Sequence, residues 1–264
     1  MSAVPLGNNS TDRKIEKQML FIRQILFNIA FYGWTTISCF LMLPFLIMPH
    51  KIYVVAVTAY FKSVHLLEKY ILGLDYVVIG AENLPKDGKT FLVAAKHQSA
   101  YETMKLYLLF NDPAIILKRE LAWIPLWGWI ALKSGAIAIN RKSREIAVAS
   151  LTEGAKRIKK TGRPIVIFPQ GTRVPVNSSP EQYRYRPGIV KMAKAAHLDI
   201  VPMAMNTGLF WEKKAFFKKP GIATFSILPP LSHQMSTEEL MKTMTKQIEE
   251  ESNRLRDLAL RKES

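Results

Sequence analysis

The chain reads TFLVAA at residues 90–95 and continues as KHQSAYE at residues 96–102. A short, continuous apolar run is typical of a strand that is buried on both faces of a sheet. We expect a helix at residues 100–109, so this stretch predicts a strand that passes through a turn into a helix. Repetition of that unit along a chain is the pattern of an α/β fold.

The same alternation continues after this first unit. Further strands are predicted at residues 114–117, 135–139, 164–168 and 200–205, and further helices at residues 143–160, 189–196 and 236–261. Residues 224–228 are expected to add an edge strand. Strands of continuous apolar character need helices on both sides of their sheet. We therefore predict an α/β fold with a mostly parallel sheet and helices on both faces.

A long stretch near the N-terminus carries no formal charge. Residues 25–48 carry no formal charge, and a continuous helix of this length would reach roughly 36 Å, enough to cross a hydrocarbon core of about 30 Å. Pro44 and Pro49 interrupt its second half. Basic residues flank both ends, so the positive-inside rule gives no orientation. We favour a helical hairpin that enters one leaflet over a single pass, with a buried helix of a soluble protein as the third alternative.

Composition agrees with a membrane or phosphate partner. The 264 residues carry a formal net charge of +16, and residues 235–264 contribute only −1 of it, so the basic surface belongs to the body of the chain. Anionic membranes, phosphorylated substrates and nucleic acids would all attract such a surface. The single cysteine, Cys39, excludes an intrachain disulfide. We expect residues 1–74 to form a membrane-associated helical segment and residues 75–264 an α/β domain.

His97 and Glu102 carry the first chemical signal. Residues five apart on one helix differ by about 140° around its axis, so His97 belongs to the turn and Glu102 to the first helical turn. The pair predicts a general base, because histidine titrates near neutral pH and a carboxylate favours its protonated form. The structural alternative is a capping box, with Ser99 at the N-cap and Glu102 three residues later. The two roles are compatible.

Cations follow several of the predicted strands. FPQGTR occupies residues 168–173, where Gly171 permits a close backbone approach and Arg173 offers a fork that matches phosphate oxygens. Lys118 follows the strand at residues 114–117, and Arg141 follows the strand at residues 135–139. Each could be a solvated charge at a tight turn. Together they predict an anion-binding corner at one edge of the sheet.

Four blocks in this order resemble the glycerolipid acyltransferase family, and within it the bacterial 1-acylglycerol-3-phosphate acyltransferases. The blocks are HQSAYE, KRELAWIPLWG followed by AINR, FPQGTR, and IVPMAM. Glu102 stands where the family has aspartate, which keeps the charge and adds a methylene. Gln170 stands where the family has glutamate, which removes a charge near Arg173.

The resemblance implies acyl transfer from acyl-CoA or acyl carrier protein to the free hydroxyl of 1-acylglycerol-3-phosphate, which gives phosphatidic acid. His97 would be the general base, and Glu102 would orient it. The acceptor would be bound by Lys118, Arg141, Gln170, Gly171, Thr172 and Arg173. Attack would be direct, because Ser99 is better explained as a cap. No metal and no cofactor beyond the acyl donor are expected.

The resemblance also implies a location and leaves alternatives open. We expect phospholipid membrane as a partner, no nucleic acid, and an active site on the cytoplasmic face of a bacterial inner membrane. The alternatives are an acyltransferase for another lysolipid, such as lyso-ornithine lipid, and a non-enzymatic protein that binds anionic lipid. The aromatic and basic stretches at residues 183–188 and 211–219 fit membrane contact or a solvated loop. Trp123, Trp127 and Trp129 fit an acyl groove or core packing.

Overall fold

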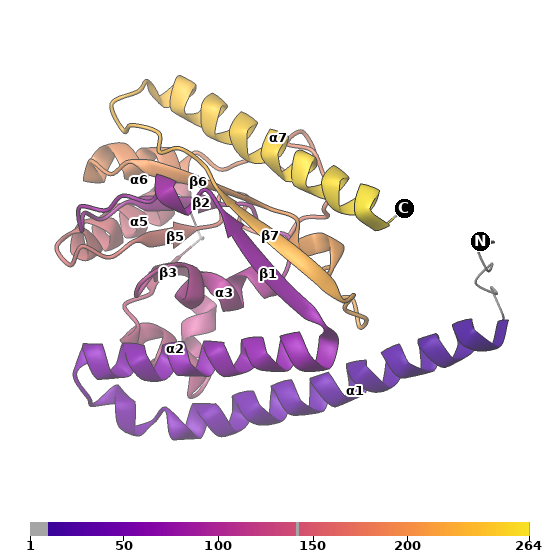
Figure 1. The fold of residues 1–264 in the computed structure, drawn as a ribbon. Helices are drawn as coiled ribbons and strands as arrows, with labels where there is room; N and C mark the ends of the chain where they lie inside the picture. The colour runs from indigo at the N-terminus through magenta and orange to yellow at the C-terminus, as the bar shows by residue number, and fades with distance from the viewer. Residues whose placement is uncertain (1–9, 141–142, 264) are drawn as a thin grey trace.

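A seven-stranded sheet forms the centre of the computed structural model, which describes residues 10–140 and 143–263 (Figure 1). Its spatial order is β1-β7-β6-β2-β5-β3-β4. The strands are β1 (Leu74–Ile79), β2 (Leu92–Ala95), β3 (Ala114–Lys118), β4 (Ile137–Ile139), β5 (Ile165–Ile167), β6 (Ile200–Met205) and β7 (Gly221–Ile227). All neighbours pair in parallel except β6 and β7, which are antiparallel. The predicted mostly parallel sheet is confirmed.

Helices cover both faces of this sheet, as predicted. They are α1 (Ser10–Leu41), α2 (His50–Leu67), α3 (Tyr101–Leu109), α4 (Trp127–Lys133), α5 (Arg144–Lys159), α6 (Gly188–Ala196) and α7 (Thr237–Glu263). One apolar core joins α5, α6 and α7 to the sheet. A second core joins α1, α2 and α3 to the other face, below the sheet in Figure 1. The central strands β2, β5 and β6 are apolar throughout because both of their faces are buried.

Two details of the sheet differ from the sequence-based prediction. The expected edge strand at residues 224–228 corresponds to β7, which is internal and pairs with both β1 and β6, so the prediction of an edge position is wrong. The edge strand on that side of the sheet is β1, which was not predicted. Only Leu74 of β1 is buried, and Val77, Val78 and Ile79 are exposed. The strand therefore lacks the alternation of buried and exposed positions that marks strands in a sequence.

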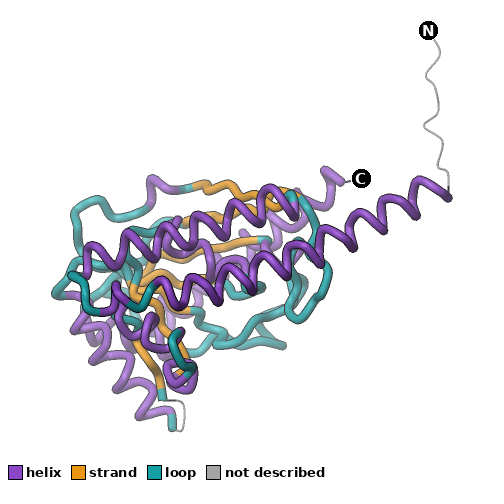
Figure 2. Tube along the Cα trace, turned by 90° about the horizontal axis from the view of Figure 1, so that it is seen from below, coloured by secondary structure: helices purple, strands orange, loops and turns teal. Residues whose placement is uncertain are grey.

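The N-terminal helices form a hairpin against the sheet. α1 and α2 run in opposite directions and lie side by side in Figures 1 and 2. Pro44 opens the short 3-10 helix at the bend, and Pro49 precedes α2 at its N-cap, so the two prolines end one helix and begin the next. Phe27 and Val64 of the hairpin join the same core as Phe225 of β7.

The outer face of α1 is apolar. Residues Gln18–Leu41 are long and apolar enough to cross a membrane by length and composition, and only 17% of the most apolar window is buried. Large exposed apolar side chains include Phe21, Ile22, Ile25, Ile29 and Phe40. This exposure disfavours the alternative of a buried core helix. The helical hairpin is present, and its insertion into one leaflet stays a prediction.

Candidate active site

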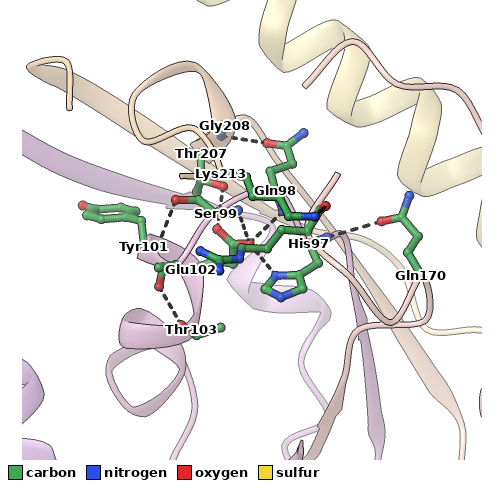
Figure 3. A network of polar contacts seen from close by, with 12 residues as sticks. His97, Gln98, Ser99, Tyr101, Glu102, Thr103, Gln170, Thr207, Gly208 and Lys213 are labelled. Carbon is green, nitrogen blue, oxygen red and sulfur yellow. Dashed lines mark hydrogen bonds and ion pairs between the residues drawn. The ribbon is translucent and has the colours of Figure 1, made fainter. Parts of the chain in front are cut away.

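The carboxyl ends of β2, β5 and β3 meet at one edge of the sheet, and His97 lies there. His97 follows β2 by two residues, and Glu102 lies in the first turn of α3. The Nδ1 atom of His97 is 2.8 Å from Oε1 of Glu102 (Figure 3). The Glu102 side chain is fully buried and that of His97 is 16% exposed. The turn therefore holds the two residues together, as their spacing predicts.

Glu102 accepts hydrogen bonds from four donors. Its Oε1 atom also accepts the backbone N–H groups of Gln98 at 2.8 Å and Ser99 at 2.7 Å, and its Oε2 accepts the hydroxyl of Thr207 at 2.7 Å. Because backbone N–H groups only donate, Oε1 is an acceptor, and the Nδ1 of His97 must carry the proton it shares. The lone pair of the imidazole is then on Nε2.

The predicted capping box is not formed in the expected register, and its side chains bond within the turn that precedes α3. α3 begins at Tyr101 with Ala100 before it, one residue later than the predicted N-cap at Ser99. The Oγ of Ser99 accepts the N–H of Tyr101 at 3.1 Å, and Glu102 returns to the N–H of Ser99. The Glu102 carboxylate therefore ties down the turn before α3 and orients His97 at once, but the predicted N-cap at Ser99 is wrong, because Ala100 takes that position without a side-chain cap.

The ring of His97 faces a large apolar cavity. It stacks on Phe168, with ring centroids 4.0 Å apart, and lines a cavity of about 990 Å³. The walls come from the hairpin, α3, α4, α5 and the start of α6, and they are largely aliphatic and aromatic. Representative lining side chains are Phe31, Tyr53, Met104, Ile130, Leu151 and Ile189. Such a cavity suits a hydrocarbon chain better than a polar solute.

Some of the predicted binding residues lie on this cavity. Lys118 lines it at the end of β3, with half of its side chain exposed and Glu120 at 3.4 Å. Gly171 lines it with a φ of 70°, a left-handed conformation that glycine adopts without strain. Arg141 lies outside the described residues. The structure thus brings His97, Lys118 and Gly171 to one cavity.

The contacts made by the other predicted binding residues lie outside this cavity. Gln170 is buried, and its Oε1 accepts the backbone N–H of His97 at 3.5 Å. The Oγ of Thr172 and the carbonyl oxygen of Arg173 both accept from Nζ of Lys213, at 3.2 and 3.0 Å. None of the three lines the cavity in the part of the chain that the structure describes. Their expected contact with the acceptor stays a prediction.

This geometry agrees with comparisons to known proteins. A profile of the acyltransferase family matches residues 75–206, which include His97, Glu102 and the whole of FPQGTR. A 1-acyl-sn-glycerol-3-phosphate acyltransferase from Pseudomonas aeruginosa is 32% identical over 216 residues, covering 80% of each chain. The chain belongs to the acyltransferase family. A second relative, the 1-acyl-sn-glycerol-3-phosphate acyltransferase of Saccharomyces cerevisiae, is 31% identical over 65% of this chain and 56% of its own length.

A solved structure shows that the acyltransferase fold extends to the hairpin. The 1-acyl-sn-glycerophosphate acyltransferase PlsC from Thermotoga maritima superimposes with a TM-score of 0.69 at 24% identity. The match covers 92% of this chain and 97% of that one, which is more than the family profile spans. The N-terminal helices are therefore part of the shared fold.

Sequence reasoning did not assign two residues to this candidate site, although one of them belongs to the 183–188 stretch that was considered for membrane contact. Thr207 follows β6 and reaches Glu102 across 105 positions of sequence. Arg186 precedes α6 and lines the cavity. The sequence does show a hydroxyl shortly after an internal strand and a cation shortly before a helix. Neither pattern indicates which distant segment the side chain contacts.

The tryptophans of the second block have different places. Trp127 lines the cavity, in agreement with the acyl-groove interpretation. Trp123 and Trp129 are 76% and 53% exposed, so neither packs in a core. Among residues 10–140 and 143–263, no three His, Cys, Asp or Glu side chains come together as a metal site.

Proposed function

We propose that this chain transfers a fatty acyl group from a thioester to the free hydroxyl of 1-acylglycerol-3-phosphate, which gives phosphatidic acid. The observation that carries the proposal is His97, which is held by Glu102 through Nδ1 and lines an apolar cavity of about 990 Å³. The relatives from Pseudomonas aeruginosa and Saccharomyces cerevisiae, both named as 1-acyl-sn-glycerol-3-phosphate acyltransferases, support the same acceptor.

In the proposed reaction His97 acts as the general base. Its Nε2 accepts the proton of the acceptor hydroxyl as the hydroxyl oxygen attacks the thioester carbonyl carbon. The negative charge of Glu102 stabilises the imidazolium that forms. The tetrahedral intermediate then collapses, the carbon–sulfur bond breaks, and the imidazolium returns the proton to the leaving thiolate. The oxygen ester and the free thiol are the products.

The surroundings of His97 suit both ends of such an acceptor. The apolar walls accommodate hydrocarbon, and Lys118 supplies a cation for the phosphate at the same cavity. We also propose that the acceptor is bound by Arg141, Gln170, Thr172 and Arg173. The donor is acyl-CoA or acyl carrier protein, which is a co-substrate, and no other cofactor is proposed.

The α1–α2 hairpin gives the enzyme access to its lipid substrate. Its outer face is apolar, and its inner face supplies Phe31, Tyr53 and Val57 to the cavity. An apolar helical surface of this kind binds at a membrane interface. We propose that the hairpin enters one leaflet, that the acceptor passes from that leaflet to His97, and that the site faces the cytoplasm at a bacterial inner membrane.

The test is turnover by the purified chain in lipid vesicles. Lysophosphatidate with acyl-CoA or acyl carrier protein should give phosphatidic acid and one free thiol per product. His97→Ala should lower kcat by about 10²–10⁴-fold while the circular dichroism spectrum stays unchanged. A fully active variant would exclude this mechanism. Faster turnover of lyso-ornithine lipid would point to the alternative acceptor, and no turnover of any lysolipid to a non-enzymatic lipid-binding protein.

A further inference from the structure

Arg186 is a cation on the cavity wall that no motif assigns. It lies two residues before the start of α6, and it lines the same cavity as His97 and Gly171. Its side chain is exposed, so it sits where the cavity opens to the surface. Lys118 is the other basic side chain of Lys or Arg type on the described part of this wall.

The two cations differ in how they are engaged. Lys118 has the Glu120 carboxylate 3.4 Å from its Nζ. The guanidinium of Arg186 has no ion pair or hydrogen bond to any residue in the described ranges. An arginine without a protein partner keeps its donors available, and its planar fork matches two oxygens of one phosphate.

The backbone at Arg186 is fixed although its side chain is free. Its N–H donates to the carbonyl oxygen of Pro169 at 2.9 Å, which ties it to the turn that carries Gly171. The neighbouring Tyr185 is buried, and its hydroxyl donates to Oε1 of Glu249 at 2.7 Å. Burial and the nearby Glu249 raise the pKa of Tyr185, so the hydroxyl keeps the proton that it donates.

Glu249 connects this anchor to the strand that carries His97. Its Oε2 atom accepts from Nζ of Lys96 at 2.8 Å, and the Lys96 side chain is fully buried. Lys96 and Tyr185 are each one residue from a side chain on the cavity wall, His97 and Arg186. One carboxylate of α7 thus holds both backbone segments at a fixed separation.

We propose that Arg186 binds the phosphate of the lysolipid acceptor. This inference rests on the proposed function and adds a residue that determines which acceptor is used. With the acyl chain against the apolar walls and the hydroxyl at His97, the phosphate of the acceptor needs a cation at the open end of the cavity. Arg186 supplies two parallel N–H donors there, and its fixed backbone limits the loss of conformational entropy on binding.

The test compares Arg186→Ala with Arg184→Ala in the full chain. Arg184 is the matched control, because it is exposed, two residues away, and does not line the cavity. The KM for lysophosphatidate should rise about 10- to 100-fold in Arg186→Ala, the equivalent of one charged hydrogen-bond contact, and should not change in Arg184→Ala. With a monoacylglycerol, which has no phosphate, the two variants should match the wild type. Arg186→Lys should recover part of the loss.

Three results would overturn this inference. Equal KM values for lysophosphatidate in Arg186→Ala and the wild type would remove the contact. A rise confined to the KM for acyl-CoA would assign Arg186 to the donor phosphates. Weaker sedimentation of Arg186→Ala with phosphatidylglycerol vesicles, in proportion to the change in KM, would assign Arg186 to the membrane surface.

If the wild type makes no phosphatidic acid from lysophosphatidate, the proposed function fails instead. Arg186→Gln, which keeps a polar side chain without the charge, replaces Arg186→Ala should the latter not fold.

Discussion

The hydroxyl of Thr207 donates to Oε2 of Glu102 at 2.7 Å, across 105 positions of the sequence. Both side chains are fully buried, so the contact is shielded from water. It holds Oε2 of the carboxylate, while Oε1 accepts the hydrogen bond from Nδ1 of His97. The segment that follows β6 therefore helps to set the orientation of the proposed catalytic pair, His97 and Glu102.

Thr207→Val should weaken both folding and catalysis. The variant keeps the shape of the side chain but leaves Oε2 of Glu102 buried without a partner, which costs about 1–3 kcal/mol. A Glu102 carboxylate that can rotate orients His97 less well. We therefore expect kcat to fall roughly tenfold, which is part of the 10²–10⁴-fold rate enhancement that a general base typically contributes. Urea unfolding and steady-state kinetics measure the two effects. The control is Thr161→Val, whose hydroxyl donates to the carbonyl of Ile158 away from the site; equal losses of kcat in the two variants would contradict the role of Thr207.

Glu102→Gln should abolish most of the activity. An amide cannot offset the charge of the imidazolium, although its oxygen can still accept from Gln98 and Ser99 while its NH2 group donates to the Thr207 hydroxyl. We expect kcat to fall by about 10²–10⁴-fold. Kinetics of the detergent-solubilised protein, at a temperature where circular dichroism shows it folded, measure this loss.

Glu102→Asp separates reach from charge. Aspartate is the residue of the family pattern and keeps the carboxylate, but its side chain is shorter. In this turn Oε1 of Glu102 accepts from His97 and from two backbone N–H groups, and a shorter side chain has less reach toward these donors. We expect a kcat loss of roughly tenfold, well short of that in Glu102→Gln. An Asp variant as active as the wild type would mean that the turn adjusts to either length.

Sequence patterns predicted the parts of the site that are local. His97 and Glu102 are five residues apart, so one strand-to-helix turn sets their relation, and the structure agrees. Lys118 ends an internal strand and Gly171 lies in the turn after another, and both were predicted because the carboxyl ends of parallel strands lie at one end of the sheet. The same logic predicted β2, β5 and β6, which are apolar on both faces.

The remaining parts depend on which distant segments meet. Arg173 follows an internal strand as Lys118 does, yet its backbone carbonyl accepts from Lys213, a partner 40 positions away. Arg186 and Thr207 gain their roles from contacts with the 168–171 turn and with Glu102. No local period encodes such contacts. The edge position of β1 was missed for a related reason, because its exposed face needs no buried partner.

Glu249→Gln should lower the stability of the fold and disturb the site at a distance. The change leaves the fully buried ammonium of Lys96 without a counter-charge. Removal of one partner from a buried pair costs about 3–5 kcal/mol. The neighbouring Glu250 provides the control, since it is 67% exposed and 3.8 Å from Lys246. Glu250→Gln should change the free energy of unfolding by less than about 1 kcal/mol, and a similarly small change in Glu249→Gln would contradict the bridge.

The Lys96 ammonium should also give the fold an unusual dependence on alkaline pH. Burial lowers the pKa of Lys96, an effect that the Glu249 carboxylate opposes. The folded chain therefore releases this proton at a lower pH than the unfolded chain, whose lysines titrate near 10.5. Between those two pKa values the unfolded chain binds more protons, so this residue makes stability rise with pH. Urea unfolding from pH 8 to 10 should show a steeper rise for the wild type than for Lys96→Met, and parallel curves would contradict the assignment.

The exposed face of α1 can be tested by placing charge on it. Ile25 and Ile29 are four residues apart, so they lie on one face of the helix, and they are 39% and 68% exposed. Ile25→Glu with Ile29→Glu should weaken flotation with phosphatidylglycerol vesicles at least tenfold, because each buried aliphatic side chain contributes about 1.5–3 kcal/mol. The control is Ile222→Glu on β7, which is 58% exposed and lies outside the hairpin.

Activity of the double variant on lysophosphatidate in vesicles should fall with membrane binding. Its activity in detergent micelles should persist, since neither Ile25 nor Ile29 lines the cavity. Unchanged flotation of the double variant would place the membrane contact on another surface.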